Sequence, residues 1–326
     1  MLLDLARSRK ILFFGGKGGV GKTTVAAATA VARADEGGRV LLVSTDPAHN
    51  LGHLFDRTIG ADPVRIISGL DAIELDPSST VDAHLSEVSR ALHQLMPVDQ
   101  HKEIDKHMDL SRSAPGMQEA AILERIAEVV ENGVSDYDLI VFDTAPSGHT
   151  ARLMVLPEMM SAWTEGLIKR RERADRFSGF FRDLGRDDSN LADTSLSEVN
   201  TEQERESRIR QILLRRRARF SGLRDRLADA LVTSFVIVLA AERLPVLESI
   251  ELQEQLLHAG ISVDALVVNK RSPRNSGDFL AERRQQEEIH LHTLSEALPD
   301  LPRQDITLMA QDVVGLAAVQ RLAAVL

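Results

Sequence analysis

The chain has 326 residues, of which 43% are hydrophobic, and a formal net charge of −10 at pH 7. This length allows one large α/β domain with an insertion, and the acidic balance argues against general binding to nucleic acid. The absence of cysteine excludes disulfide bonds, thiolate metal sites and iron–sulfur ligation by cysteine.

The first predicted strand, residues 9–14, is followed by a glycine-rich turn and by an alanine-rich helix that begins at Thr23. The turn matches G-x-x-x-x-G-K-T, whose backbone N–H groups hold phosphate at a helix N-terminus. We expect Lys22 to reach the β- and γ-phosphates and the Thr23 hydroxyl to bind Mg²⁺. The residues predicted to bind the nucleotide here are Gly16, Lys17, Gly18, Gly19, Val20, Gly21, Lys22, Thr23 and Thr24.

Two further strands are predicted to end in carboxylates that belong to the same site. Residues 39–44 form the second strand, and Asp46 follows it, where it could orient the attacking water or accept its proton. The alternative for Asp46 is an Asp-Pro turn at a strand end. Residues 138–142 form the fourth strand, and Asp143 after it is expected to bind Mg²⁺ directly or through water. The loop from Asp143 to Thr150 contains Pro146 and Gly148, so it could change shape when the γ-phosphate leaves.

The composition changes between residues 156 and 227, where apolar strands disappear and arginine, serine and aspartate dominate. We predict a helical insertion there, with a flexible polar middle over residues 186–200, inside a core formed by residues 1–155 and 228–326. Its apolar stripes could pack against each other or against an apolar segment of a client protein. The methionine and aromatic side chains that could contact such a client are Met159, Met160, Trp163, Phe177, Phe180 and Phe181.

The remaining strands are predicted at residues 72–75, 234–239 and 265–268. Continuous apolar strands that alternate with helical stretches indicate a mostly parallel α/β sheet with helices on both faces. Ligands of such sheets bind at the carboxyl ends of the strands. The tail, residues 313–326, is expected to be a packed helix. No run is long enough to span a bilayer, and no signal peptide is evident, so we expect a cytoplasmic protein.

The whole pattern resembles the ArsA family of ATPases, which comprises arsenite-pump ATPases and the ATPases of guided entry of tail-anchored proteins. The resemblance is carried by G-K-G-G-V-G-K-T-T with its additional Lys17, by D-P-A-H-N after the second strand, and by D-T-A-P-S-G-H-T after the fourth. It covers nearly the whole chain. It implies a homodimer in which Lys17 crosses to the partner's nucleotide, with ATP and Mg²⁺ as cofactors. It also implies that Asp46 is the hydrolytic residue and that Asn269, with Glu242, touches the nucleoside.

The chain departs from this family in two places. It lacks the cysteines that hold a bridging zinc or a metalloid, and residues 306–311 lack the usual proline near the last strand. We therefore keep three functions open. The first is a nucleotide-switched carrier that shields an apolar segment of a membrane protein. The second is the ATPase subunit of an anion pump of the arsenite type, and the third is a positioning ATPase similar to ParA or MinD.

Overall fold

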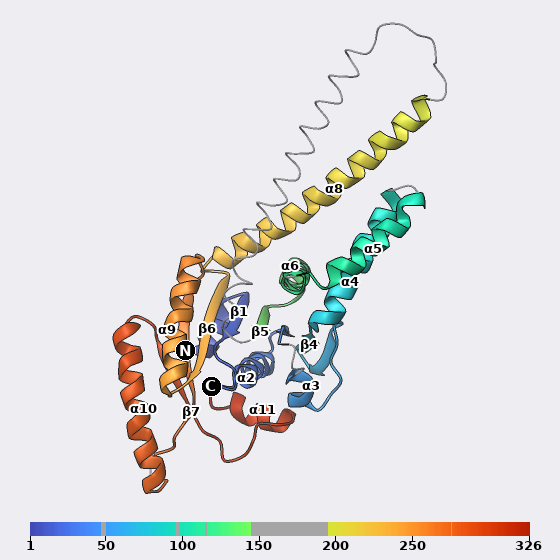
Figure 1. Ribbon diagram of the computed structural model, residues 1–326. Coiled ribbons are helices and arrows are strands. Elements are labelled where there is room, and N and C mark those ends of the chain that lie inside the picture. The colour runs from blue at the N-terminus through green and yellow to red at the C-terminus, as the bar shows by residue number, and fades with distance from the viewer. Residues whose placement is uncertain (47–49, 96–97, 115, 145–194, 275) are drawn as a thin grey trace.

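The computed structural model describes residues 1–46, 50–95, 98–114, 116–144, 195–274 and 276–326. These residues form one eight-stranded sheet in the order β3-β4-β2-β5-β1-β6-β7-β8, in which each pair of neighbours is parallel except β3 and β4 (Figure 1). The strands are β1 (Ile11–Gly15), β2 (Val40–Ser44), β3 (Val64–Ile67), β4 (Leu70–Glu74), β5 (Leu139–Asp143), β6 (Thr233–Ala240), β7 (Val263–Arg271) and β8 (Arg303–Thr307). The predicted α/β class and mostly parallel sheet are confirmed.

Helices cover both faces of the sheet, because its central strands are apolar on both sides. One face packs against α1 (Leu2–Ser8), α2 (Lys22–Asp35), α3 (Asn50–Phe55) and α11 (Leu316–Ala323). The other face packs against α6 (Met117–Asp136), α9 (Arg243–His258), α10 (Asp278–Ala297) and the C-terminal end of α8 (Ser195–Ala228). The predicted tail helix is therefore present as α11 on the first face.

Two strands, β3 and β8, escaped the sequence analysis, which predicted six. Both lie at the edges of the sheet, where a strand has one neighbour and half of its side chains face solvent. In β8 only Ile306 is buried, so the segment has no apolar run for a pattern search to find.

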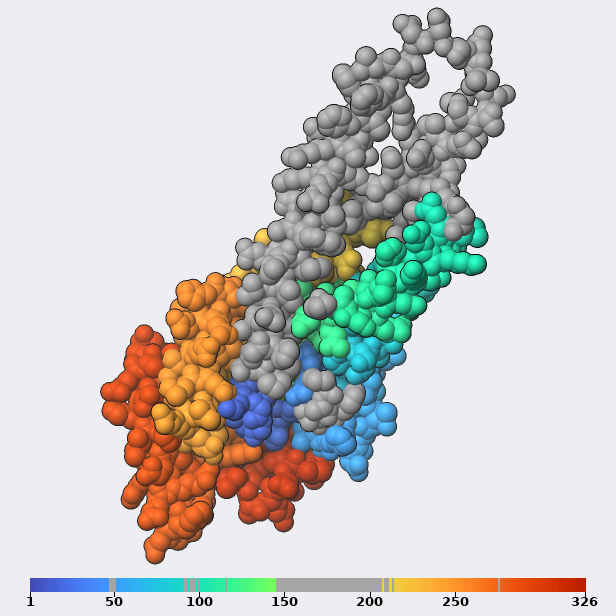
Figure 2. All heavy atoms as spheres, viewed as in Figure 1, coloured from blue at the N-terminus to red at the C-terminus, as the bar shows by residue number. Residues whose placement is uncertain are grey.

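A group of helices extends beyond the sheet, and we call α4 (Pro77–Leu95), the 3₁₀ turn η1 (Val98–Gln100), α5 (His101–Arg112) and α8 the helical arm (Figures 1 and 2). Glu124 of α6 ties it together: its carboxylate accepts from Arg216 of α8 at 2.6 Å and lies 2.9 Å from His84 of α4. The arm therefore includes residues before the predicted insertion. Residues 195–200, expected to be flexible, belong to α8.

Residues 145–194 lie outside the described residues. The stripe around Trp163 and the loop after Thr144 therefore stay predictions. None of the described helices has both the length and the apolar composition needed to cross a membrane.

Candidate nucleotide site

The carboxyl ends of three central strands are level with one another, and this alignment builds the site. In the strand register, Asp143 at the end of β5 pairs with Phe14 of β1 on one side and with Ser44 of β2 on the other. The glycine-rich turn follows β1 and Asp46 follows β2, so segments far apart in sequence meet at one edge.

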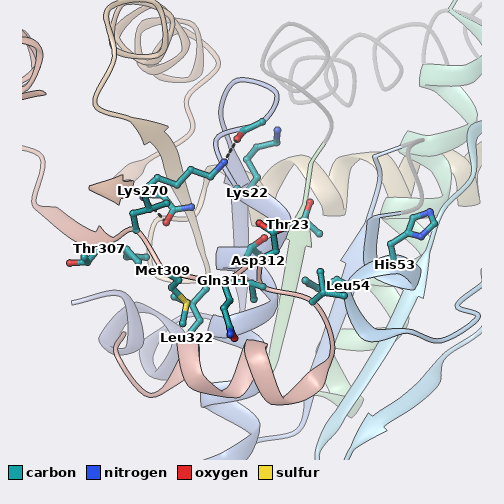
Figure 3. A pocket seen from close by; sticks show the side chains of 18 of the residues that line it. Lys22, Thr23, His53, Leu54, Lys270, Thr307, Met309, Gln311, Asp312 and Leu322 are labelled. Atoms are coloured by element: carbon teal, nitrogen blue, oxygen red, sulfur yellow. Dashed lines mark hydrogen bonds between the residues drawn. The ribbon is translucent and has the colours of Figure 1, made fainter. Parts of the chain in front are cut away.

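A cavity of about 490 Å³ opens at this edge. The close view in Figure 3 shows Thr23 at its centre, with Lys270 and Thr307 on one side and Leu54 on another. The predicted site residues among those lining it are Gly18, Gly19, Gly21, Lys22, Thr23, Thr24, Asp46 and Asn269.

The glycine-rich turn adopts the backbone that a phosphate cradle needs. Gly16, Gly19 and Gly21 have positive φ, and Gly21 precedes the first residue of α2. The Lys22 side chain is 5% exposed, and its Nζ donates to the carbonyl oxygen of Lys17 at 3.1 Å, so the turn closes around it. Burial lowers the pKa of Lys22, whereas the charges of Asp143 and Asp46 oppose this shift. An anion in the cavity would meet a cation and several N–H groups together.

Replacing Gly16 by Ala should destabilise the fold more than replacing Gly19 by Ala. A Cβ at Gly16 would lie 2.0 Å from the backbone oxygen of Val238, whereas at Gly19 it would meet open space. Positive φ disfavours both alanines by about 1–2 kcal/mol, and the collision adds a further cost at Gly16 alone. Urea unfolding of the two variants measures the difference. Equal losses of unfolding free energy would contradict the close packing of the turn on β6.

Asp143 lies below the glycine-rich turn and is fully buried. One carboxylate oxygen, Oδ2, accepts from Thr23 Oγ1 at 2.7 Å and from Ser44 Oγ at 3.3 Å. The other, Oδ1, is buried and has no hydrogen-bond partner among the described residues. Burial raises the pKa of Asp143 to about 7, although Thr23 and Lys22 pull it down. The negative charge on the Asp143 carboxylate is therefore only partly offset, and a bound cation would offset the rest. Carboxylate and hydroxyl oxygens are ligands that Mg²⁺ prefers. The residues present therefore fit the predicted metal.

Asp46 also lines the cavity, and its backbone N–H donates to Ser44 Oγ at 3.3 Å.

The helix that follows this segment, α3, is fixed by a carboxylate that the sequence analysis missed. Glu74, buried at the end of β4, accepts from the backbone N–H of Leu51 at 3.0 Å. The signal was present, because Glu74 ends an apolar strand as Asp143 does.

Lys17 lies outside the set of described residues that line the cavity. Its Nζ lies 2.6 Å from Oε1 of Glu248 in α9, and both side chains are about one-third exposed. Lys17 therefore points away from the chain's own phosphate cradle and stands at the surface beside it. No sequence signal marked Glu248, since its place on an ordinary helix gives no hint of this contact.

The wall of the cavity that is predicted to hold the nucleoside is built by β7, β8 and the segment after β8. Asn269 Nδ2 donates to the carbonyl oxygen of Val20 at 2.9 Å, and Lys270 Nζ donates to that of Gly19 at 2.9 Å. Residues 306–309 and Gln311 complete this wall, although the segment lacks the family's proline. Glu242 lies elsewhere. It is exposed, it is not among the described residues that line the cavity, and it forms an ion pair of 2.9 Å with Arg283. The structure thus brings Asn269 to the cavity but not Glu242.

The amino-acid sequence is similar to those of known ATPases. The model of the ArsA ATPases, described as anion-transporting ATPases, matches residues 9–326. A putative arsenical pump-driving ATPase 2 of Aquifex aeolicus is 30% identical over 307 residues, which are 94% of this chain and 95% of that protein. The arsenical pump-driving ATPase of Escherichia coli is 30% identical over 318 residues, 95% of this chain but 48% of that protein. The ATPase GET3 of Malassezia globosa is 29% identical over 318 residues, with 95% and 88% covered.

Proposed function

Because the chain belongs to the ArsA family of ATPases, we propose that it is a cytoplasmic homodimeric switch whose ATP hydrolysis controls the shielding of an apolar segment of a membrane protein. The observation that carries the ATPase part is the meeting of the glycine-rich turn and Asp46 at one cavity, with Asp143 buried next to it and hydrogen-bonded to Thr23 of the lining. Such an arrangement holds a triphosphate, a metal and a water together, which is most of what phosphoryl transfer to water requires.

Each side chain has a distinct part in this proposal. The N–H groups of the turn and the Lys22 ammonium bind the phosphates. Thr23 and Asp143 would hold Mg²⁺, which offsets the charge on the phosphate oxygens. Asp46 orients the attacking water and accepts its proton. Asn269 and the wall from Ile306 hold the nucleoside.

A second subunit would complete the site. Lys17 already stands at the surface beside the phosphate cradle, where Glu248 keeps its charge paired. In the proposed dimer each Lys17 leaves Glu248 and acts on the partner's nucleotide, as a cation placed against the charge that develops in the transition state. The described residues contain one phosphate loop, so a lysine in trans requires a second copy of the chain.

The helical arm is the proposed client surface. Large apolar side chains stand exposed on it at Val98, Leu110, Ile212 and Leu214. A membrane-spanning helix of about 20 residues is 30 Å long, and an arm of this kind offers helices of comparable length.

A second candidate function is the driving subunit of an anion pump. It is favoured by the names of two relatives, the putative arsenical pump-driving ATPase 2 of Aquifex aeolicus and the arsenical pump-driving ATPase of Escherichia coli. The chain has no cysteine with which to bind arsenite. In this alternative the membrane partner would therefore recognise the anion, while the ATPase supplies the cycle.

The double substitution Ile212→Glu and Leu214→Glu should reduce retention of an apolar 20-residue helical peptide about tenfold or more, because the two residues lie on opposite sides of α8 and a charge would enter the apolar contact whichever side binds. Retention is measured by pulldown, with the double substitution placed in ATP-loaded protein that also carries Asp46→Asn. Basal ATPase activity is measured with the double substitution in protein that keeps Asp46. The matched control is Leu257→Glu, which changes an exposed leucine of α9 outside the arm. Equal retention by all variants would refute the arm as client surface. No retention by the unsubstituted arm in either nucleotide state would favour the pump function.

A further inference from the structure

Arg271 at the end of β7 is a buried arginine whose side chain is 2% exposed. It is paired with carboxylates from two other elements. Nη1 lies 2.5 Å from Oε2 of Glu287, Nη2 bonds to Glu288 of the same helix α10, and Nε lies 3.1 Å from Oδ2 of Asp305 in β8. Arg271 is outside the described lining of the cavity. A buried arginine is costly unless it is fully paired, so a cluster like this fixes the geometry around it.

The backbone beside Arg271 is irregular at the residues that face the glycine-rich turn. Val268 pairs with Asp305 and Arg271 pairs with Thr307, so β7 holds one more residue than β8 over this step. The extra length forms a bulge that contains Asn269 and Lys270, and Lys270 has φ 57. A residue other than glycine in this left-handed region needs surrounding structure to hold it.

The bulge turns two side chains toward the glycine-rich turn. Asn269 Nδ2 donates to the carbonyl oxygen of Val20. Lys270 Nζ donates to the carbonyl oxygen of Gly19, and a dashed line marks this bond in Figure 3. Asn269 also accepts from the backbone N–H of Lys270 at 2.9 Å. Without the bulge, Asn269 and Lys270 would follow the pleat of a regular strand and point to opposite faces.

Arg271 also contacts the part of the same wall that follows β8. Its carbonyl oxygen accepts from the backbone N–H of Leu308 at 2.8 Å, and Leu308 lines the cavity. The next residue, Ser272, donates from Oγ to Glu287 at 2.6 Å, which binds the strand end to α10. One arginine thus joins the bulge of β7, the end of β8 and helix α10.

We propose that Arg271 is a positioning residue for the nucleoside half of the cavity, which sets base affinity through Asn269, Lys270 and Leu308 without touching the ligand. This inference rests on the proposed nucleotide site. The phosphate half is held separately by the turn between β1 and α2, whose Lys22 bonds within that turn. Loss of Arg271 should therefore weaken binding of the nucleoside and leave binding of the phosphates as it is.

The test compares two ligands, ATP and inorganic tripolyphosphate, by titration calorimetry with Mg²⁺. In Arg271→Lys the shorter ammonium cannot keep three carboxylates, so ATP affinity should fall about tenfold while tripolyphosphate affinity stays within about twofold. Turnover at saturating ATP should stay within about twofold of that of the unsubstituted protein, because weaker ATP binding raises KM and leaves kcat unchanged. The matched control is Arg303→Lys, which weakens a pair with the same Asp305 at 3.1 Å but lies at the start of β8.

A second variant, Glu288→Gln, keeps the inference testable if Arg271→Lys does not fold. Glu288 is 55% exposed in its side chain, and its loss should give the same selective effect at a smaller size, about twofold to fivefold. A role limited to stability would lower both affinities in parallel, or neither, and either result overturns the inference. If the unsubstituted protein binds tripolyphosphate but not ATP, the proposed function fails instead.

Discussion

Replacing Lys17 by Ala is expected to lower the turnover of ATP by roughly 10³-fold or more, the effect of removing a cation supplied in trans to a phosphoryl-transfer site. Nucleotide affinity should change little, because in the proposed site the phosphates of each nucleotide are bound by Lys22 of the same chain. Lys22 is buried in the turn. Turnover and nucleotide affinity are measured side by side, by phosphate release and by calorimetry. Lys22→Ala should instead abolish binding.

The Glu248→Gln variant separates the lysine from its ion pair. It breaks the same 2.6 Å contact but keeps the ammonium, so it should retain near-normal turnover. A similar loss in Glu248→Gln and Lys17→Ala would mean that the ion pair, and not the free lysine, is needed. Full turnover by Lys17→Ala would contradict the trans arrangement.

Mixing Lys17→Ala with Asp46→Asn tests the direction of the contact. If Lys17 acts across the interface, each mixed dimer has one site with its own Asp46 and the partner's Lys17. Random pairing in an equal mixture should then restore about a quarter of normal turnover. If Lys17 acts within its own chain, every site carries one defect and nothing is restored.

Replacing Asp46 by Asn is expected to lower turnover by roughly 10²–10⁴-fold, the usual contribution of a positioned general base. ATP affinity should stay near normal, because the carboxylate acts on the water and the phosphates are held by the turn. Single-turnover phosphate release and ATP titration are the measurements. Asp312→Asn is the matched control, since Asp312 lines the same cavity but follows β8. A parallel collapse of affinity and rate would show that Asp46 binds the nucleotide rather than the water.

The local pattern of the sequence was enough to predict the fold class and most of the eight predicted residues that line the cavity of the candidate site. Apolar runs bounded by glycine and charged residues predicted six strands, because a buried parallel strand needs apolar side chains on both faces. The glycine spacing with Lys22 and Thr23 predicted the phosphate cradle, because positive φ and a helix N-terminus are local properties. The convergence of Asp46 and Asp143 followed from one topological rule on strand ends.

The remaining features depend on contacts between residues that are far apart in the chain, and only the tertiary structure decided them. The edge strands β3 and β8 each have one neighbour in the sheet, and β8, in which only Ile306 is buried, carries little apolar signal of its own. The pair between Lys17 and Glu248 joins residues 231 positions apart, and the Arg271 cluster joins three elements. Glu242 shows the same limit, because the family resemblance assigned it to the nucleoside, whereas the structure places it outside the described residues that line the cavity, in an ion pair with Arg283. Such pairings are set by how helices and strands pack on the sheet, and no short window of sequence records that packing.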